Sequence, residues 1–479
     1  MQYNELAMNV QIPTKVSEIT LTFEKANYEI YIAGGAVRDV LMGKNVYDWD
    51  FTTNATPDAM LKLFSDAFYD NLFGTIGIPS EIEGERPYEI TTFRTEYGYS
   101  DSRRPDKVEW GKTLEEDLKR RDFTINAMAL RRKAPQGKPH RHSGSGRKDS
   151  PGLEEIEVEL IDLYNGQEDL ESKLIRAVGD PNDRFSEDAL RMMRAVRIAS
   201  ELGFAIEANT LNAIKGNATL INKIAKERVK DELFKILASP FPYDGMMLFK
   251  NVGLMQEILP EMEKTFGVEQ KSPGRHHIYD VGTHSLLSLK YVAEKNKDSI
   301  VRFATMIHDI GKPLTNKKLE TGTITFYNHE IVGAKIAKRI ADRLKFSNKE
   351  KDKLYRLVRY HQFTVDERQT DSAIRRFIRK IGLEDIQDML DLRVGDRLGG
   401  GARETSWRLE EFKKRLIEVQ KQPFTVRDLK IDGRDVMKIL NISPGPKIGK
   451  VLQKLYDEVV EKKLPNEKEP LIQKLKEIT

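Results

Sequence analysis

Two patterns of hydrophobic and polar residues divide the chain. In the first, short apolar runs alternate with turn residues; across residues 28–53 this predicts a strand, a Gly-Gly turn, a short helix that ends at Gly43 and a second strand. From about residue 170 onward, apolar residues recur at helical spacing. The pattern therefore predicts a mixed α/β N-terminal third and helices in nearly all of the rest. Further strand-like runs lie around 74–80, 86–94 and 157–163, and the helical ranges are 185–202, 208–237, 283–296, 299–310, 330–345 and 347–361.

A basic, turn-rich segment lies between these two parts. Residues 131–152 combine Gly, Ser and Pro with seven Lys or Arg residues against one Asp, so we expect a loop. Such a loop is either a solvated insertion or a segment that touches RNA phosphates, and phosphate contacts position an RNA without reading its sequence. The last segment, 423–479, is helical in pattern and rich in lysine. Its Gly445–Lys450 run is one residue too short for a P-loop, and Val451 stands where a magnesium-binding hydroxyl is required.

Length and composition narrow the class of protein. At 479 residues the chain is long enough for roughly three domains, and 39% hydrophobic with 32% charged residues is typical of a folded protein. No apolar run reaches the roughly 18 residues of a membrane span, and the N-terminus lacks the basic start and apolar core of a signal peptide. The absence of cysteine excludes disulfides, thiolate metal sites and thiol nucleophiles. We therefore expect a cytoplasmic protein without membrane association. Its net charge of +4 indicates a polyanionic partner only where the cations cluster.

Two carboxylates and a Gly-Gly turn are the first candidates for chemistry. Asp48 and Asp50 lie two residues apart on a predicted strand, so both side chains are expected on one face, close enough to share divalent cations. Two-metal phosphoryl transfer needs this arrangement, although an Asp-x-Asp pair is also found at solvated strand ends. Upstream, Gly34 and Gly35 let backbone N–H groups approach a phosphate, and Arg38 can add charge-assisted hydrogen bonds.

The stretch Gly34–Asp50 resembles the first motif of the class II tRNA nucleotidyltransferases, the CCA-adding enzymes, whose motifs bacterial poly(A) polymerases share. The resemblance covers the chain up to about residue 240, and segment 131–152 departs from it by being longer and more basic. Four later segments are similar to further motifs of the family and occur in its order: Arg120–Ala127, Asp162–Asp169, Glu187–Arg194 and Lys226–Leu237.

Residues of the later motifs are expected to read the nucleobase. Asp188 can accept from an exocyclic amine while Arg191 donates to a ring acceptor, which suits cytosine and adenine and opposes guanine and uracil. The resemblance implies this role, so that CTP and ATP are chosen without a nucleic-acid template. Arg191, Arg194 and Arg197 recur every three residues. They can form a cationic stripe that meets a triphosphate or an RNA backbone. Alternatively, they lie on a solvated helix face on which Glu187 pairs with Arg191.

The second motif is expected to hold ribose and phosphate. Arg121, Asp122 and Asn126 would make these contacts, and an Asp122 that accepts from the 2′-OH would favour ribonucleotides. Glu89 is a possible third metal ligand. Residues 94–107 resemble the loop of those family members that add the terminal A, which favours a complete CCA or an A-adding activity over CC addition.

A second constellation combines histidine with aspartate. Only eight histidines exist, and imidazole with carboxylate is a ligand set for Mn, Ni, Fe, Mg or Zn in a helical scaffold. The run Ala304–Lys312 is similar to the HD phosphohydrolase superfamily, and the resemblance implies His284, His308, Asp309 and Asp396 as metal ligands. A metal ion in such a site can activate water for attack on a phosphomonoester or cyclic phosphodiester, or it can serve stability alone. His329 and His361 are candidates for a second metal position.

The resemblances imply an α+β fold: a mixed α/β, polymerase beta-like nucleotidyltransferase head followed by an all-helical neck, body, HD domain and tail. We expect the head in residues 1–165, the neck and body in 166–275, the HD domain in 276–400 and a tRNA-binding tail in 401–479.

The expected reaction is template-independent transfer of CMP, CMP and AMP from CTP and ATP to the 3′ end of tRNA. Asp48 and Asp50 would hold Mg²⁺, a divalent transition metal or Mg²⁺ would fill the HD site, and no obligate protein partner is evident. The alternatives are a poly(A) polymerase or A-adding enzyme of the same family, a signalling nucleotidyltransferase fused to an HD hydrolase, and a non-catalytic RNA-binding protein.

Overall fold

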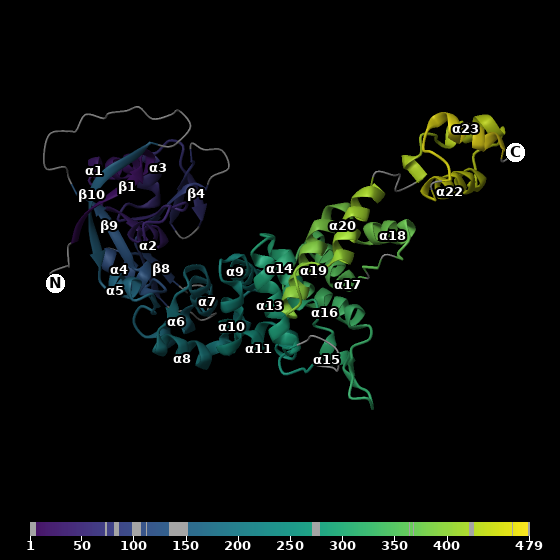
Figure 1. Ribbon diagram of the computed structural model, residues 1–479. Coiled ribbons are helices and arrows are strands. Elements are labelled where there is room, and N and C mark those ends of the chain that lie inside the picture. Colours follow the sequence, from purple (N-terminus) through teal and green to yellow (C-terminus); the bar gives the residue numbers. More distant parts are fainter. Residues whose placement is uncertain are drawn as a thin grey trace. The chain divides into compact units, whose positions relative to one another are not determined.

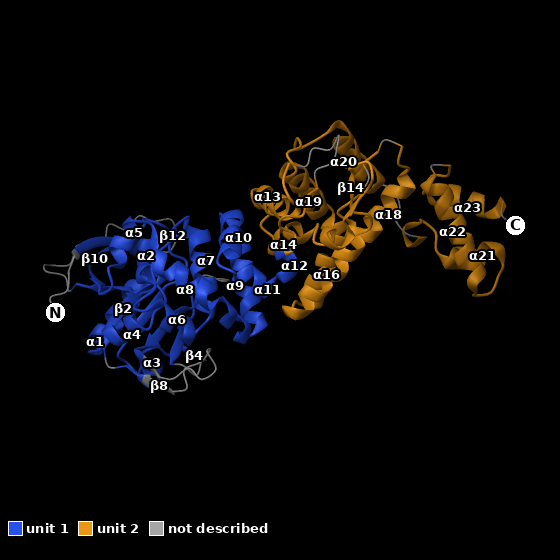
Figure 2. Cartoon of the chain, turned by 90° about the horizontal axis from the view of Figure 1, so that it is seen from below, with its two compact units in different colours: residues 1–263 blue, residues 264–479 orange. Residues whose placement is uncertain are grey.

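The computed structural model describes residues 6–71, 74–80, 86–97, 107–111, 113–133, 152–270, 278–363, 365–366, 368–420, 426–461 and 463–477. The chain forms two compact units, residues 1–263 and 264–479, which we call unit 1 and unit 2 (Figure 2). Each unit is described by itself.

Unit 1 begins with a mixed sheet of eight strands in the order β1-β10-β9-β2-β3-β6-β5-β4. Neighbouring strands are antiparallel except for β3 and β6, which are parallel. Apolar side chains of the sheet and of the helices on it, such as Ile12, Ile32 and Phe51, are almost fully buried. The strands of the sheet are β1 (Leu6–Pro13), β2 (Ile30–Ala33), β3 (Asp50–Thr53), β4 (Phe68–Asn71), β5 (Thr75–Ile78), β6 (Tyr88–Thr92), β9 (Met128–Arg132) and β10 (Leu153–Asp162).

Helices of unit 1 pack on the sheet and then follow it (Figure 1). Two shorter sheets, β7 (Arg94–Tyr97) with β8 (Lys107–Trp110) and β11 (Leu174–Ile175) with β12 (Ala205–Ile206), complete the unit. The helices are α1 (Thr14–Lys25), α2 (Gly35–Leu41), α3 (Pro57–Leu63), α4 (Leu114–Lys119), α5 (Gly166–Glu171), α6 (Pro181–Glu187), α7 (Leu190–Leu202), α8 (Ala208–Asn217), α9 (Lys226–Ala238), α10 (Pro242–Asn251), α11 (Leu254–Ile258) and α12 (Pro260–Glu263), with 3₁₀ turns η1 (Thr124–Asn126) and η2 (Ala218–Lys223).

Unit 2 is built from helices, with one small hairpin of β13 (Lys317–Lys318) and β14 (Ile324–Thr325). A separate apolar cluster around Leu455 and Leu471 holds the last three helices together. The helices are α13 (Val281–Ala293), α14 (Ser299–Ile307), α15 (Lys312–Thr315), α16 (His329–Arg343), α17 (Asn348–Tyr360), α18 (Asp371–Ile381), α19 (Ile386–Gly399), α20 (Trp407–Gln420), α21 (Gly433–Leu440), α22 (Pro446–Val460) and α23 (Lys468–Glu477), with 3₁₀ turns η3 (Leu383–Asp385) and η4 (Val426–Asp428).

The predicted fold class, a mixed α/β head followed by helices, is confirmed. The predictions of one helix over 185–202 and of one helix over 208–237 are wrong. Asp188 is extended (φ −140°, ψ 103°) and ends α6 before α7 begins, and the 3₁₀ turn η2 followed by the extended Ile224 (φ −81°, ψ 140°) separates α8 from α9. Segment 131–152 is also not all loop: Arg131 and Arg132 end β9, where they pair with β10, while 134–151 lie outside the described residues, as do 98–106 of the predicted A-adding loop. The domain boundaries stay a prediction.

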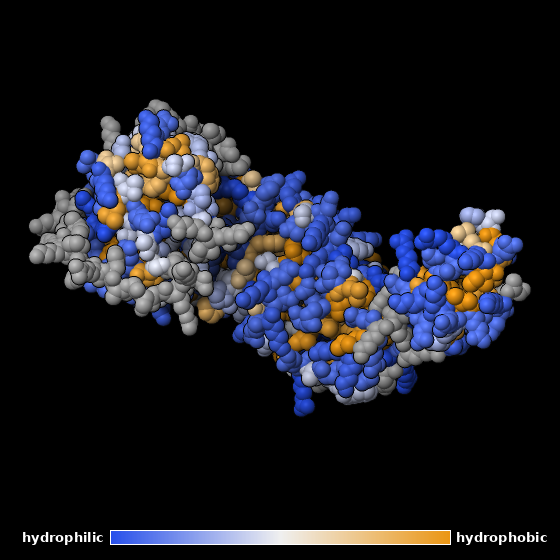
Figure 3. Space-filling view, turned by 90° about the horizontal axis from the view of Figure 1, so that it is seen from above, coloured by the Kyte–Doolittle hydropathy of each residue, from blue (hydrophilic) through white to orange (hydrophobic). Residues whose placement is uncertain are grey.

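Hydrophilic residues cover most of the face seen in Figure 3, with smaller hydrophobic areas between them. None of the helices in the described part of the chain has both the length and the apolar character that crossing a bilayer requires.

Candidate active site and metal centre

The carboxylate pair of the head lies where β3 begins. Asp50 is the first residue of the strand, whereas Asp48 precedes it, so the prediction that both lie on the strand is wrong for Asp48. The physical reason lies in the antiparallel neighbour β2. Its last paired residue is Ile32, opposite Phe51, and the chain turns at Gly34 two residues later, so β2 offers no backbone partner to Asp48. The alternation of side chains persists nevertheless: Trp49 is buried, and the Asp48 carboxylate is half exposed and lies 3.0 Å from Arg86 Nη1.

Asp50 lies in an environment rich in negative charge. Burial, followed by the charge of Asp48 and that of Glu89, raises the pKa of Asp50 from 3.8 to about 7, although Arg121 opposes the shift. Glu89 is directly opposite Asp50 in the parallel pair of β3 and β6. Asp48 just before β3, Asp50 at its start and Glu89 on β6 all carry carboxylates, the ligand type that hard divalent cations prefer.

The Gly-Gly turn brings a second charged group to Asp50. Gly34 has φ +77°, a conformation that L side chains rarely adopt, and a Cβ built on it would lie 2.8 Å from Arg121 Nη1 and 3.5 Å from Asp50 Oδ2. The Arg121 guanidinium and the Asp50 carboxylate therefore meet at the bare backbone of Gly34. Arg38, on α2, donates to Asn126 Oδ1 at 2.9 Å, so the two predicted motifs are joined by a direct hydrogen bond.

Asp117, which the sequence reasoning missed, holds the arginines of this site. Its side chain is fully buried on α4 and accepts from Arg120 Nη2 at 2.6 Å and from Arg121 Nη2 at 3.2 Å. Burial opposes its ionisation, but Arg120 and Arg121 outweigh that effect and lower the pKa of Asp117 to about 2. The signal was present in the sequence, because Asp117 precedes the two arginines by three and four residues, the spacing of one helix face.

The predicted base-reading residues lie at the junction of α6 and α7, and each is held by neighbours. Asp188 Oδ1 accepts from Leu190 N at 3.0 Å, and Asp188 Oδ2 from Arg228 Nη2 of α9 at 2.8 Å. Arg191 donates to Glu187 Oε2 at 2.7 Å and to the Arg120 carbonyl at 2.8 Å. Sequence reasoning missed Arg228, although it lies within a segment that resembles a family motif.

The other two arginines of the predicted stripe are also in ion pairs. Arg194 donates through Nε and Nη2 to Asp122 Oδ2 at 2.7 and 2.6 Å, which joins α7 to the second motif. Burial raises the pKa of Asp122, but Arg194 and Arg191 outweigh it and lower that pKa to about 2. Arg197 donates to Glu232 of α9 at 2.8 Å. The nucleotide contacts assigned to these residues stay predictions.

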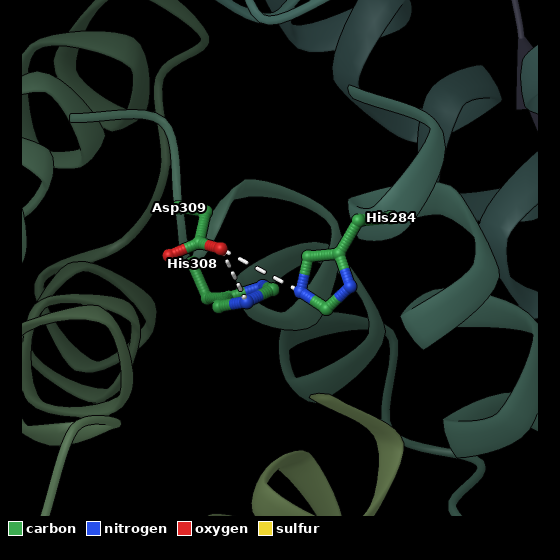
Figure 4. A group of neighbouring side chains, drawn as sticks. All are labelled: His284, His308 and Asp309. Atoms are coloured by element: carbon green, nitrogen blue, oxygen red, sulfur yellow. Dashed lines mark ion pairs between the residues drawn. The ribbon is translucent and has the colours of Figure 1, made fainter. Parts of the chain in front are cut away.

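Unit 2 brings the histidine and aspartate series together in a buried cluster. His284 lies on α13, His308 and Asp309 follow α14, and Asp396 lies on α19; three of these four side chains are at most 3% exposed and Asp396 is 19% exposed. Asp309 Oδ2 is 3.5 Å from His284 Nε2 and 3.2 Å from His308 Nε2 (Figure 4). Asp396 Oδ1 is 3.1 Å from His284 Nε2 and 3.5 Å from His308 Nε2. The predicted ligands thus converge on one point.

Close helix packing explains this convergence. A Cβ on Gly399 of α19 would lie 2.3 Å from Ser288 Oγ of α13, so only glycine lets the two helices come close enough for Asp396 to reach His284. Burial opposes charge on His308, yet Asp309 and Asp396 outweigh it and raise the pKa of His308 to about 10. His308 and Lys312 in turn hold the pKa of Asp309 well below its usual range against burial.

The cluster opens onto a cavity of about 550 Å³, within the range of small-molecule sites. Its wall combines the carboxylates of Asp309, Glu330 and Asp396 with the cations Lys312, Arg393 and Arg397, so its formal charges balance. Lys312 Nζ is 2.5 Å from Asp309 Oδ2, which brings a cationic side chain to the ligand cluster.

Three family descriptions match the chain: "Poly A polymerase head domain" over residues 30–176, "Probable RNA and SrmB- binding site of polymerase A" over 203–266 and "tRNA nucleotidyltransferase domain 2 putative" over 319–475. A CCA-adding enzyme of Limosilactobacillus reuteri is 34% identical over 95% of this chain and 94% of its own length. Another, of Ligilactobacillus salivarius, is 33% identical over 97% of this chain and 96% of its own.

Solved structures agree with these relatives. The chain is similar to the Bacillus stearothermophilus CCA-adding enzyme in complex with CTP, with a TM-score of 0.67 at 27% identity over 97% of each chain. It shares its fold with the Thermotoga maritima CCA-adding enzyme complexed with tRNA, with a TM-score of 0.57 at 17% identity over 99% of each chain.

Proposed function

The chain belongs to the family of CCA-adding enzymes, the class II tRNA nucleotidyltransferases, and we infer from this that it adds CMP, CMP and AMP to the 3′ end of tRNA without a template. The substrates are tRNA, CTP and ATP, and pyrophosphate is released. The observation that supports placing this reaction in the head is the group of Asp48, Asp50 and Glu89 beside the Gly34 turn.

Enzymes of this family use a divalent metal ion, and we assign Mg²⁺ to Asp48 and Asp50, with Glu89 as a further ligand. The carboxylate oxygens fit the ion's preference for hard ligands. When bound, Mg²⁺ neutralises the triphosphate and favours the ionised 3′-hydroxyl. The chain's own part is to place the reactants: Arg121, fixed by Asp117, and Arg38, tied to Asn126, can donate to phosphate oxygens next to Asp50.

Base choice is assigned to Asp188 and Arg191. Their hydrogen bonds to Arg228, Glu187 and the Arg120 carbonyl hold both side chains in fixed orientations before a nucleotide arrives. Rigid groups that match the amine and ring acceptor of cytosine or adenine leave unpaired polar edges with guanine or uracil, at a cost of about 1–3 kcal/mol each. The ion pair of Asp122 with Arg194 competes with the predicted 2′-OH contact, so that contact requires Asp122 to share its oxygens.

One assay separates this function from its alternatives. tRNAs that end before CCA, after C and after CC are each incubated with one NTP at a time. A CCA-adding enzyme extends the first two with CTP only and the third with ATP only. Poly(A) synthesis would give long A tails on all three, A addition alone would leave the first two unextended, and an RNA-binding protein would extend none.

The catalytic assignment is tested by Asp48→Ala and Asp50→Ala. Both variants should lose CMP and AMP addition alike while tRNA affinity changes little, because we expect the helical segments that follow the head to make most of the tRNA contacts. If both retained more than about a tenth of the wild-type rate, the assignment would fail, since a tenth corresponds to only about 1.4 kcal/mol of barrier.

For unit 2 we propose a second function, a metal-dependent phosphoesterase with His284, His308, Asp309 and Asp396 as ligands. The four donor atoms are 3.1–3.5 Å apart wherever imidazole faces carboxylate. Donors about 2.1 Å from one ion stand about 3.0–3.4 Å apart at octahedral or tetrahedral angles, so the cluster fits a metal with little movement. A bound ion would supply Lewis acidity and activate water, while Lys312 and Arg393 would bind the anionic substrate.

The two activities should be separable. His308→Ala should abolish hydrolysis of a 2′,3′-cyclic nucleotide and leave CMP addition intact, and Asp50→Ala should do the reverse. Both are assayed after chelation and addition of nickel, manganese or magnesium. A wild type that hydrolyses no phosphoester with any metal, yet melts at a lower temperature after chelation, would make the centre structural.

A further inference from the structure

One row of residues crosses the sheet of unit 1 at the site proposed for Mg²⁺. Residues that pair across neighbouring strands carry their side chains on the same face of a sheet. Asp50 of β3 pairs with Glu89 of β6. Glu89 pairs in turn with Gly77 of β5, and Gly77 pairs with Phe68 of β4, the last strand of the sheet. Phe68 therefore lies on the face that carries Asp50, three strand spacings of about 4.8 Å away.

Gly77 leaves room on this face for the ring of Phe68. A Cβ built on Gly77 would lie 2.5 Å from Cζ of Phe68 and 2.9 Å from its Cε2, so the tip of the ring occupies the place of the side chain that Gly77 lacks. The ring thus reaches toward Glu89, which is one strand spacing beyond Gly77. Phe68 is nevertheless 42% exposed. A strand glycine often marks the close approach of another group, and here that group is an accessible aromatic ring.

The geometry of nucleotidyl transfer assigns the two reactants to opposite sides of Asp50. The triphosphate contacts that we propose lie at Gly34, which follows β2, and at Arg121, which meets Gly34. β2 and β6 flank β3 on opposite sides. Because the attacking and leaving oxygens of a phosphoryl transfer are roughly in line, a pyrophosphate that leaves on the side of β2 requires a hydroxyl that attacks from the side of β6. The RNA that carries this hydroxyl then lies over β6, β5 and β4.

We propose that Phe68 binds the 3′-terminal base of the tRNA by stacking on it, and thereby holds the attacking 3′-hydroxyl beside Asp50 and Glu89. The inference rests on the function proposed for the head and adds to it a residue that binds the RNA end. Stacking on an aromatic ring is tolerant of base identity, because every base has a π-face. This tolerance fits a reaction in which the terminal base of the RNA changes as the end grows.

The test combines a change in the protein with a change in the RNA. AMP addition is measured as kcat/KM for a tRNA that ends in CC and for the same tRNA whose terminal nucleotide lacks its base. In the wild type we expect the missing base to lower kcat/KM by about 5- to 150-fold, the usual range for one stacked base. Phe68→Ala should lower it by a similar factor with the normal tRNA and by little more with the abasic one, because both changes remove the same contact. The KM for ATP should not change.

Tyr69 provides a matched control. It is 45% exposed and lies on the same strand, but it pairs with Ile76, so its side chain is on the opposite face of the sheet. Tyr69→Ala should therefore keep the full response to the missing base, as should Phe68→Tyr, which retains the ring.

A purely structural role of Phe68 is the alternative, because an aromatic ring beside a strand glycine also stabilises a sheet. Phe68→Leu covers Gly77 without a ring. It should melt close to the wild type and yet respond to the missing base as weakly as Phe68→Ala. If Phe68→Ala and Phe68→Leu both kept the wild-type response to the missing base, the stacking contact would be overturned, while nucleotide addition by the head would stand.

A second measurement uses the unaltered protein. A tRNA with 4-thiouridine at its 3′ end is bound and irradiated, and the crosslinked residue is identified by mass spectrometry. A crosslink at Phe68 is expected, and crosslinks confined to other elements would contradict the inference. A wild type that extends no tRNA with any nucleotide would remove the proposed function and this inference together.

Discussion

Replacing Gly34 by alanine tests the reasoning about the head directly. The built Cβ lies 2.8 Å from Arg121 Nη1, whereas ordinary contact begins at 3.4 Å, so the guanidinium must move by 3.4 − 2.8, or about 0.6 Å. Arg121 is not free to swing aside, because the buried Asp117 holds its Nη2. Since a misplacement of 1 Å can cost about 100-fold in rate, we expect kcat for CMP and AMP addition to fall by roughly ten- to a hundredfold.

Two other glycines separate the causes of this loss. Gly43 has φ +65° and nothing within 4 Å of a built Cβ, so Gly43→Ala introduces backbone strain of about 1–3 kcal/mol without a clash. Gly35 does not have a positive φ, and its built Cβ meets Arg38 at 3.5 Å, an ordinary contact. Single-turnover rates of all three variants are compared after their thermal unfolding has been measured. If Gly34→Ala kept the same rate as Gly43→Ala, the contact between Arg121 and Gly34 would have no part in catalysis.

Three further predictions follow from charged groups of the head. Asp188→Ala should admit UTP or GTP, with discrimination lower by roughly one or two orders of magnitude because a base edge is no longer read; equal slowing with all four nucleotides would instead assign the residue to triphosphate geometry. Since the pKa of Asp50 is raised to about 7, protons compete with Mg²⁺ for its carboxylate below that pH. The Mg²⁺ concentration for half-maximal CMP addition should therefore rise by about tenfold per pH unit below 7. The same half-maximal concentration at pH 6 and pH 8 would contradict this. Asp117→Asn should destabilise unit 1 by about 2 kcal/mol at pH 7, because folding lowers the pKa of Asp117 from 3.8 to about 2. The difference in denaturant midpoint between wild type and variant should be full above pH 4 and should vanish as the pH falls through 2.

The sequence by itself determined the fold class and the family, and it named most of the residues that we propose for the chemistry. Local signals carry these: the Gly34-Gly35 turn and the Asp-x-Asp pair are short-range patterns, and helical spacing is visible over ten or more residues. The histidines and aspartates of unit 2 can also be recognised in the sequence. His308 and Asp309 are adjacent, and the absence of cysteine leaves histidine and carboxylate side chains as the candidate metal ligands.

Only the tertiary structure decided how these residues are held and shared. Asp117 and Arg228 contact partners that the sequence pattern does not identify. The extended backbone at Asp188 divides a stretch whose apolar spacing predicts one continuous helix. The division of the two Asp309 oxygens between His308 and His329 depends on how four helices meet in space. Residue order records which side chains exist, but the direction of each carboxylate oxygen is set by packing and by hydrogen bonds between segments far apart in the chain.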